Sequence, residues 1–86
     1  MKTFEIIHEI EQYGQESGFL ANVIRTHHRN PARKLKGLLE LLRAGHTART
    51  AQFEIDVLVI DGKRFGWEYL ESPVLVDRHA KYAQSV

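Results

Sequence analysis

Few residues of this sequence are spaced as a catalytic or metal-binding site requires. His8-Glu9 matches the start of the helical zinc motif His-Glu-x-x-His, but Gln12 occupies the position of the second histidine ligand. Three further histidines lack the i, i+4 spacing of such a motif, and the sequence has no cysteine to complete a zinc site. They are His27, His28 and His46. We expect all of these histidines to be structural or surface residues.

A second possible chemistry is that of a magnesium-dependent nuclease. Asp56, Asp61 and Lys63 provide an acid followed by an acid-x-lysine, which could hold Mg²⁺ and polarise a water molecule. Asp61 and Lys63 lie in a predicted turn, however, and a turn explains them better than a metal site does. The serines lack a nucleophile-elbow pattern, and no glycine-rich phosphate loop is present. The sequence therefore predicts a protein that is not an enzyme and uses no metal or cofactor.

Basic residues are concentrated in the middle third of the chain. The formal net charge is only +1, yet residues 25–52 contain a single acidic residue, Glu40, and the two flanking thirds are net acidic. The basic residues of this stretch are Arg25, Arg29, Arg33, Lys34, Lys36, Arg43 and Arg49. Such segregation is typical of a surface that binds a polyanion, although a single solvated helix face has the same composition.

Most of these basic residues fall on the clearest predicted element, a helix between Asn30 and Gly45. Asn30 is a good N-cap, and Pro31 suits the first helical position. Gly45 predicts a left-handed stop. The apolar positions follow the 3.6-residue period, at Leu35, Leu38, Leu39 and Leu42. The opposite face should be polar and open, and it contains Arg33, Lys36, Gly37 and Glu40.

A β-hairpin is predicted after this helix. Apolar and polar residues alternate over residues 53–59, and again over residues 64–69. The second strand carries an aromatic stripe of Phe65, Trp67 and Tyr69. This stripe is expected to form the core face of the sheet, although it could also stack the bases of single-stranded nucleic acid.

The register of this hairpin depends on the length of its turn. A two-residue turn at Asp61-Gly62 pairs Val57 with Gly66. A three-residue loop over residues 61–63 instead pairs Val57 with Trp67. A shift of one residue moves every side chain to the other face, so burial should decide the register. We favour the longer loop because it places the apolar residues of both strands on one face.

Residues 3–28 allow two interpretations. Their apolar residues recur at i, i+1 and i+4, which fits one helix ending near Gly14 and a second over residues 17–27. With a period of two, Phe4, Ile6, His8 and Ile10 could instead form a strand that pairs with residues 19–26. The acidic residues, glutamines and alanines favour the helices.

With helices in this region, the chain resembles a winged helix-turn-helix domain of the small phage and bacterial type. The resemblance rests on LLELLRAGHTARTAQFE and IDGKRFGWEYLES, and it covers residues 3–71. It implies an α+β fold of three helices followed by a β-hairpin wing, and a non-enzymatic regulator that binds double-stranded DNA. The implied groove contacts are Arg29, Asn30, Arg33 and Lys36, and the implied phosphate contacts near the wing are Arg49, Lys63 and Arg64.

With strands over residues 3–28, the order becomes β-β-α-β-β. This order is similar in architecture to small phage-encoded inhibitors, including anti-CRISPR proteins. That alternative implies a protein that binds a host nucleoprotein complex through its basic helix.

The remaining expectations concern organisation and location. Residues 1–72 are predicted to form one domain, and residues 73–86 an arm or edge strand that pairs across a homodimer or folds back on the same sheet. The longest aliphatic run, Val57–Ile60, is far too short to span a membrane, and the N-terminus lacks an apolar signal core. The absence of cysteine fits a reducing compartment, so a soluble cytoplasmic protein is expected.

Overall fold

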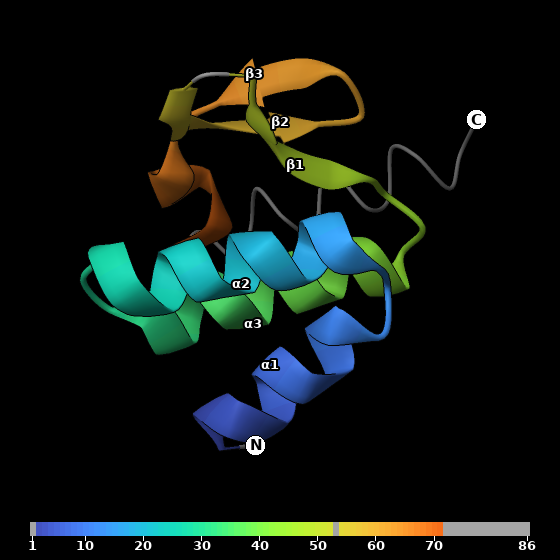
Figure 1. Ribbon diagram of the computed structural model, residues 1–86, viewed down its shortest axis with the longest axis vertical. Helices are drawn as coiled ribbons and strands as arrows, with labels where there is room; N and C mark the ends of the chain where they lie inside the picture. The colour runs from blue at the N-terminus through green and yellow to red at the C-terminus, as the bar shows by residue number, and fades with distance from the viewer. Residues whose placement is uncertain (1, 53, 72–86) are drawn as a thin grey trace.

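The computed structural model describes residues 2–52 and 54–71, which form three helices followed by a three-stranded antiparallel sheet (Figure 1). The helices are α1 (Thr3–Glu11), α2 (Gln15–His27) and α3 (Pro31–Arg43). The strands are β1 (Ala48–Ala51), β2 (Glu54–Ile60) and β3 (Lys63–Phe65), and a 3-10 helix, η1 (Trp67–Glu71), follows them. The predicted α+β class is confirmed. The alternative order β-β-α-β-β is wrong, because the region predicted to contain its first two strands forms the helices α1 and α2.

The central element of the fold is α3, which contacts α1, α2, β1 and η1. The sheet lies on one side of the α2–α3 pair and α1 on the other (Figure 1). The two helices of the pair run side by side in opposite directions (Figure 1). The order of elements, three helices followed by an antiparallel sheet, is compatible with a winged-helix layout.

The hydrophobic core is formed where these elements meet on α3. It is composed mainly of aliphatic side chains from all three helices and the inner face of the sheet, and Trp67 and Leu70 of η1 complete it. Its largest fully buried side chains include Ile10, Leu20, Leu38, Leu58 and Ile60. Because every element contributes, no helix or strand has a separate core of its own.

The two ends of α3 lie where the sequence predicts them. Gly45 has a φ of 94°, its N–H donates to the Leu42 carbonyl, and the N–H of His46 donates to the Leu41 carbonyl. This is the Schellman arrangement, which satisfies the last carbonyls of a helix. Asn30 precedes the helix as expected, but it adopts a left-handed conformation (φ 52°) and its side chain makes no capping hydrogen bond. Its predicted capping role is therefore wrong.

The predicted open face of α3 is also narrower than expected. Arg33, Lys36 and Glu40 are exposed, whereas Gly37 is buried. A Cβ atom added at Gly37 would lie 2.1 Å from the Leu70 carbonyl oxygen, so the backbone of η1 rests directly on this glycine. The predicted place of Gly37 on an open polar face is thus wrong, because η1 covers it.

The sheet corrects the predicted register. Leu58 pairs with Phe65 and Ile60 with Lys63, which leaves a two-residue turn at Asp61-Gly62. Both turn residues have positive φ, 50° and 83°, as a type I′ turn requires. The three-residue loop that we favoured is wrong. The first strand of the predicted hairpin corresponds to β2 (Glu54–Ile60), and a further strand, β1 (Ala48–Ala51), precedes it.

The aromatic stripe does not belong to a single strand. β3 ends at Phe65, and Trp67 and Tyr69 lie on η1. Trp67 is buried in the core, while the rings of Phe65 and Tyr69 stack with their centroids 4.4 Å apart. The expectation that these residues alternate along a strand is wrong, although their apolar surfaces do pack against the core.

Two further sequence expectations concern the C-terminal arm and a membrane-spanning segment. The arm predicted over residues 73–86 lies outside the described residues. Among the residues that are described, no helix is both long enough and apolar enough to cross a membrane.

Candidate nucleic-acid interface

The exposed strip of α3 contains two of the predicted site residues, Arg33 and Lys36. Both side chains are exposed, and neither makes an ion pair or hydrogen bond with any residue in 2–52 or 54–71. Their separation of three residues places them on the same face of the helix. Arg43 lies further along α3 and is bound to Glu9 of α1, so its charge is already compensated.

The turn before α3 contributes Arg29 and Asn30, both exposed. The buried side chain of Lys34 holds this turn in place, because its Nζ donates to the Arg29 carbonyl at 2.8 Å. The same Nζ donates to Oε1 of Glu71 at 2.8 Å. Lys34 therefore fixes the backbone of the turn and ties η1 to α3.

Sequence reasoning did not identify the roles of Lys34 and Glu71. In the sequence, Lys34 is only one of several bases in the basic stretch. No local pattern links it to Glu71, which lies 37 positions away. The hydrogen bond from Lys34 lowers the pKa of Glu71 from its ordinary value, and the charges of Lys34 and Arg33 act in the same direction. Arg33 and Glu71 thus influence each other electrostatically without a direct ion pair.

The ring of His28, which comes just before Arg29 in the turn that precedes α3, packs against the ring of Trp67. The two ring centroids lie 4.6 Å apart, with the planes tilted by 47°. Burial lowers the pKa of His28 from its ordinary value, and the nearby Lys34 lowers it further. His28 is therefore favoured in its neutral form, and it supports the turn by packing on the indole ring.

The predicted wing residues do not lie on a single face of the sheet. Arg49 pairs with Val59, which pairs with Arg64, so these three side chains share one face. Lys63 pairs with Ile60 and belongs to the opposite face. Arg64 also donates to Glu54 at 2.6 Å, which compensates much of its charge.

The seven predicted residues therefore form two groups. Arg29, Asn30, Arg33 and Lys36 lie at and after the start of α3, while Arg49, Lys63 and Arg64 lie on the sheet. Across residues 2–52 and 54–71, no hydrogen bond or ion pair joins the two groups. The structure brings the first group together and leaves the second divided between two faces.

Asp61, the acid considered for a nuclease, has a structural role. Its Oδ1 accepts from the backbone N–H of Thr47 at 2.9 Å, and its Oδ2 lies 2.5 Å from Nδ1 of the buried His46. These contacts join the β2–β3 turn to the segment that follows α3. No cluster of three or more potential metal ligands occurs among the residues that the structure describes.

Comparison with known proteins gives no relative: no family model matches the chain, and neither a curated protein nor a solved structure is significantly similar to it.

Proposed function

We propose that this protein binds double-stranded DNA, without catalysing a reaction, through the basic strip formed by Arg29, Arg33 and Lys36. The observation that carries the proposal is that these three exposed charges make no ion pair with an acidic residue among the described residues. Three other bases make ion pairs: Lys34 with Glu71 and Arg43 with Glu9 on α3, and Arg64 with Glu54 on the sheet. Unpaired exposed cations that lie together are what a phosphate backbone requires.

The width of the strip bears on how the DNA would be bound. Seven residues of α3 are buried: Lys34, Leu35, Gly37, Leu38, Leu39, Leu41 and Leu42. Because most of its surface is covered, α3 can present only a narrow face to a groove of the DNA. We therefore expect phosphate contacts to dominate the affinity, with Arg33 as the residue best placed for a guanine contact at the groove edge.

Fluorescence anisotropy with a labelled duplex of about 20 base pairs, repeated at several salt concentrations, tests the proposal. The three bases of the strip, Arg29, Arg33 and Lys36, make no ion pair with a described acidic residue. If all three contact phosphates, log K should fall against log salt with a slope of about −3. Arg33→Gln and Lys36→Gln should each weaken binding and reduce that slope by about 1.

Arg43→Gln is the matched control, because Arg43 lies on the same helix but is already bound to Glu9. It should leave the slope unchanged. No binding to any duplex at about 50 mM salt would exclude the proposal. Equal effects of all three substitutions would indicate a general charge effect and would remove the strip as the site.

A further inference from the structure

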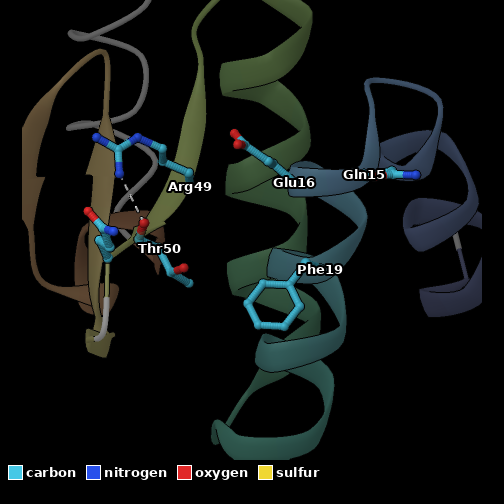
Figure 2. Close-up of a pocket in the computed structure, with 6 residues that line it drawn as sticks. Gln15, Glu16, Phe19, Arg49 and Thr50 are labelled. Atoms are coloured by element: carbon cyan, nitrogen blue, oxygen red, sulfur yellow. Dashed lines mark hydrogen bonds between the residues drawn. The ribbon is translucent and has the colours of Figure 1, made fainter.

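Two grooves that share the lining residues Gln15 and Glu16 lie beside the edge of β1. One groove, of about 270 Å³, is lined by Gln15, Glu16 and Phe19 of α2 and by Arg49, Thr50 and Gln52 (Figure 2). A second, of about 440 Å³, adjoins it at Gln15 and Glu16 and extends to residues 13–14 and 46–48. We call the two together the β1 trough.

One wall of the β1 trough is a strand edge with free backbone groups. Among residues 2–52 and 54–71, β1 is at the edge of the sheet and pairs only with β2. The Thr47 carbonyl accepts from the Asp61 N–H at 3.1 Å, and Thr50 is paired with Leu58. Because antiparallel partners alternate between hydrogen-bonded and non-hydrogen-bonded pairs, Thr50 directs its N–H and C=O away from β2. Within the part of the chain that the structure describes, the Thr50 carbonyl accepts only from the exposed side chain of Arg49, at 3.2 Å.

The other wall carries two exposed aromatic rings with an acid between them. Tyr13 is 48% exposed and Phe19 52% exposed, and they line different grooves of the trough. Glu16 lines both grooves and has no hydrogen bond or ion pair within residues 2–52 and 54–71. Glu16 and Phe19 both project from α2 towards β1, whereas the guanidinium of Arg49 lies on the far side of the strand (Figure 2).

We propose that the β1 trough binds an extended segment of a partner protein, which adds to β1 as a further strand. The segment would have a basic residue facing Glu16 and apolar residues two positions before and after it, facing Tyr13 and Phe19. Strand addition of this kind obtains its affinity from main-chain hydrogen bonds and its specificity from alternate side chains. The trough is bounded by α2 on its far side, so it fits a single strand rather than the edge of a second folded sheet.

The peptide acetyl-Val-Thr-Lys-Thr-Val-amide carries this pattern and serves as the probe. Added at up to about 5 mM to the ¹⁵N-labelled full-length protein, it should shift the backbone amides of Tyr13, Glu16, Phe19, Thr50 and Gln52. N-methylation of one peptide nitrogen at a time should weaken binding at alternate residues only, because a strand turns every second N–H towards its neighbour. The protein itself stays unchanged in that comparison.

Charge reversal tests the role of Glu16. The probe with glutamate in place of lysine should bind the native protein about threefold more weakly, as expected for an exposed ion pair. The Glu16→Lys protein should reverse this preference. Glu5→Lys, which changes an exposed acid outside the β1 trough, should not.

Three results would overturn the proposal. One is the absence of shifts at the highest peptide concentration, or shifts only outside the trough. Another is equal tolerance of N-methylation at every position. The third is protection of the Thr50 amide from hydrogen exchange in the absence of the peptide. If this protection does not depend on protein concentration, another part of this chain occupies the trough. If it rises with protein concentration, a second copy of the protein occupies it.

Discussion

At the scale of single residues, Gly37 shows how a position in the middle of a helix can be set by a distant segment. The carbonyl of Leu70 occupies the place where a Cβ atom would be, so α3 and η1 can approach closely only if this residue has no side chain. Glycine weakens a helix interior by about 1 kcal/mol relative to alanine. The close packing of η1 explains why glycine is found here despite that penalty.

Gly37→Ala should therefore destabilise the protein, although it improves helix propensity. We expect a loss of about 1–3 kcal/mol, as for an overpacked core, in the free energy of unfolding measured with urea. Gly18→Ala in α2 is the matched control, because its Cβ would make only an ordinary 3.5 Å contact with Glu11. That substitution should stabilise the protein by about 0.5–1 kcal/mol. Stabilisation by both would show that η1 does not rest on Gly37.

The Lys34–Glu71 pair predicts a dependence of stability on acidic pH. The pKa of Glu71 is lowered in the folded protein by the hydrogen bond from Lys34, so the unfolded chain binds its proton more readily. The stability that the pair provides is then present above about pH 4.5 and is lost as the pH falls through the folded pKa. Glu71→Gln should be less stable than the native protein at pH 7, and the difference should shrink below pH 4.5.

Urea titrations of both proteins at several pH values measure this effect. Glu68→Gln is the control, since Glu68 is exposed and makes no hydrogen bond or ion pair with other described residues. A difference between the native protein and Glu71→Gln that stays constant from pH 7 to pH 3 would contradict the pairing.

At the scale of elements, the β2–β3 turn holds the sheet against the end of α3. Asp61 adopts a positive φ and accepts from the backbone and hydroxyl of Thr47. Asp61→Ala removes these acceptors and places alanine in a left-handed conformation. We expect a loss of at least about 1 kcal/mol in the free energy of unfolding. Asp61→Asn should lose less, because asparagine tolerates this conformation and keeps one acceptor.

Asp56→Ala is the control for this turn, because Asp56 is exposed on β2. It should change stability by less than about 0.5 kcal/mol. Similar losses for Asp56→Ala and Asp61→Ala would mean that the contacts of Asp61 with Thr47 do not account for its contribution to stability.

The elements that could be predicted from the sequence are those whose signals are local. α3 has strong periodicity and local stop signals, and its ends lie within a residue of the prediction. The hairpin register failed for a physical reason: Leu58, Val59 and Ile60 are all buried, so β2 is covered on both faces and alternation cannot choose between registers. The positive φ that Asp61-Gly62 accommodates was the more reliable signal.

The candidate site divides in the same way. The exposure of Arg33 and Lys36 follows from the helical period of α3 and could be predicted. The buried position of Lys34 could not, because it depends on η1 folding back over α3 from a segment that reads as a strand. Contacts between residues far apart in sequence leave no mark in local periodicity.

At the scale of the whole molecule, all elements share one core around α3. Cooperative unfolding follows, since no element retains a separate core when another is lost. Trp67, the single tryptophan, reports on the packing of η1, and far-UV circular dichroism reports on the helices. Urea transitions followed by the two methods should coincide. A fluorescence transition at lower urea would show that η1 detaches from α3 while the helices remain.

Because the His28 ring contacts the Trp67 ring, the fluorescence emission of Trp67 should report the protonation state of His28. The imidazole lies against the only indole of the chain, and burial holds its pKa below the ordinary value of 6.5. As the pH falls below 6.5, a proton arrives on His28 and places a cation beside the indole, which alters the electronic surroundings of the fluorophore. The emission therefore follows the protonation of a residue in the turn that presents Arg29. If DNA binds at this turn as proposed, its phosphates add negative charge near His28 and raise the pKa of this residue. The pH midpoint of the emission change should then shift upwards, which reports binding without a label.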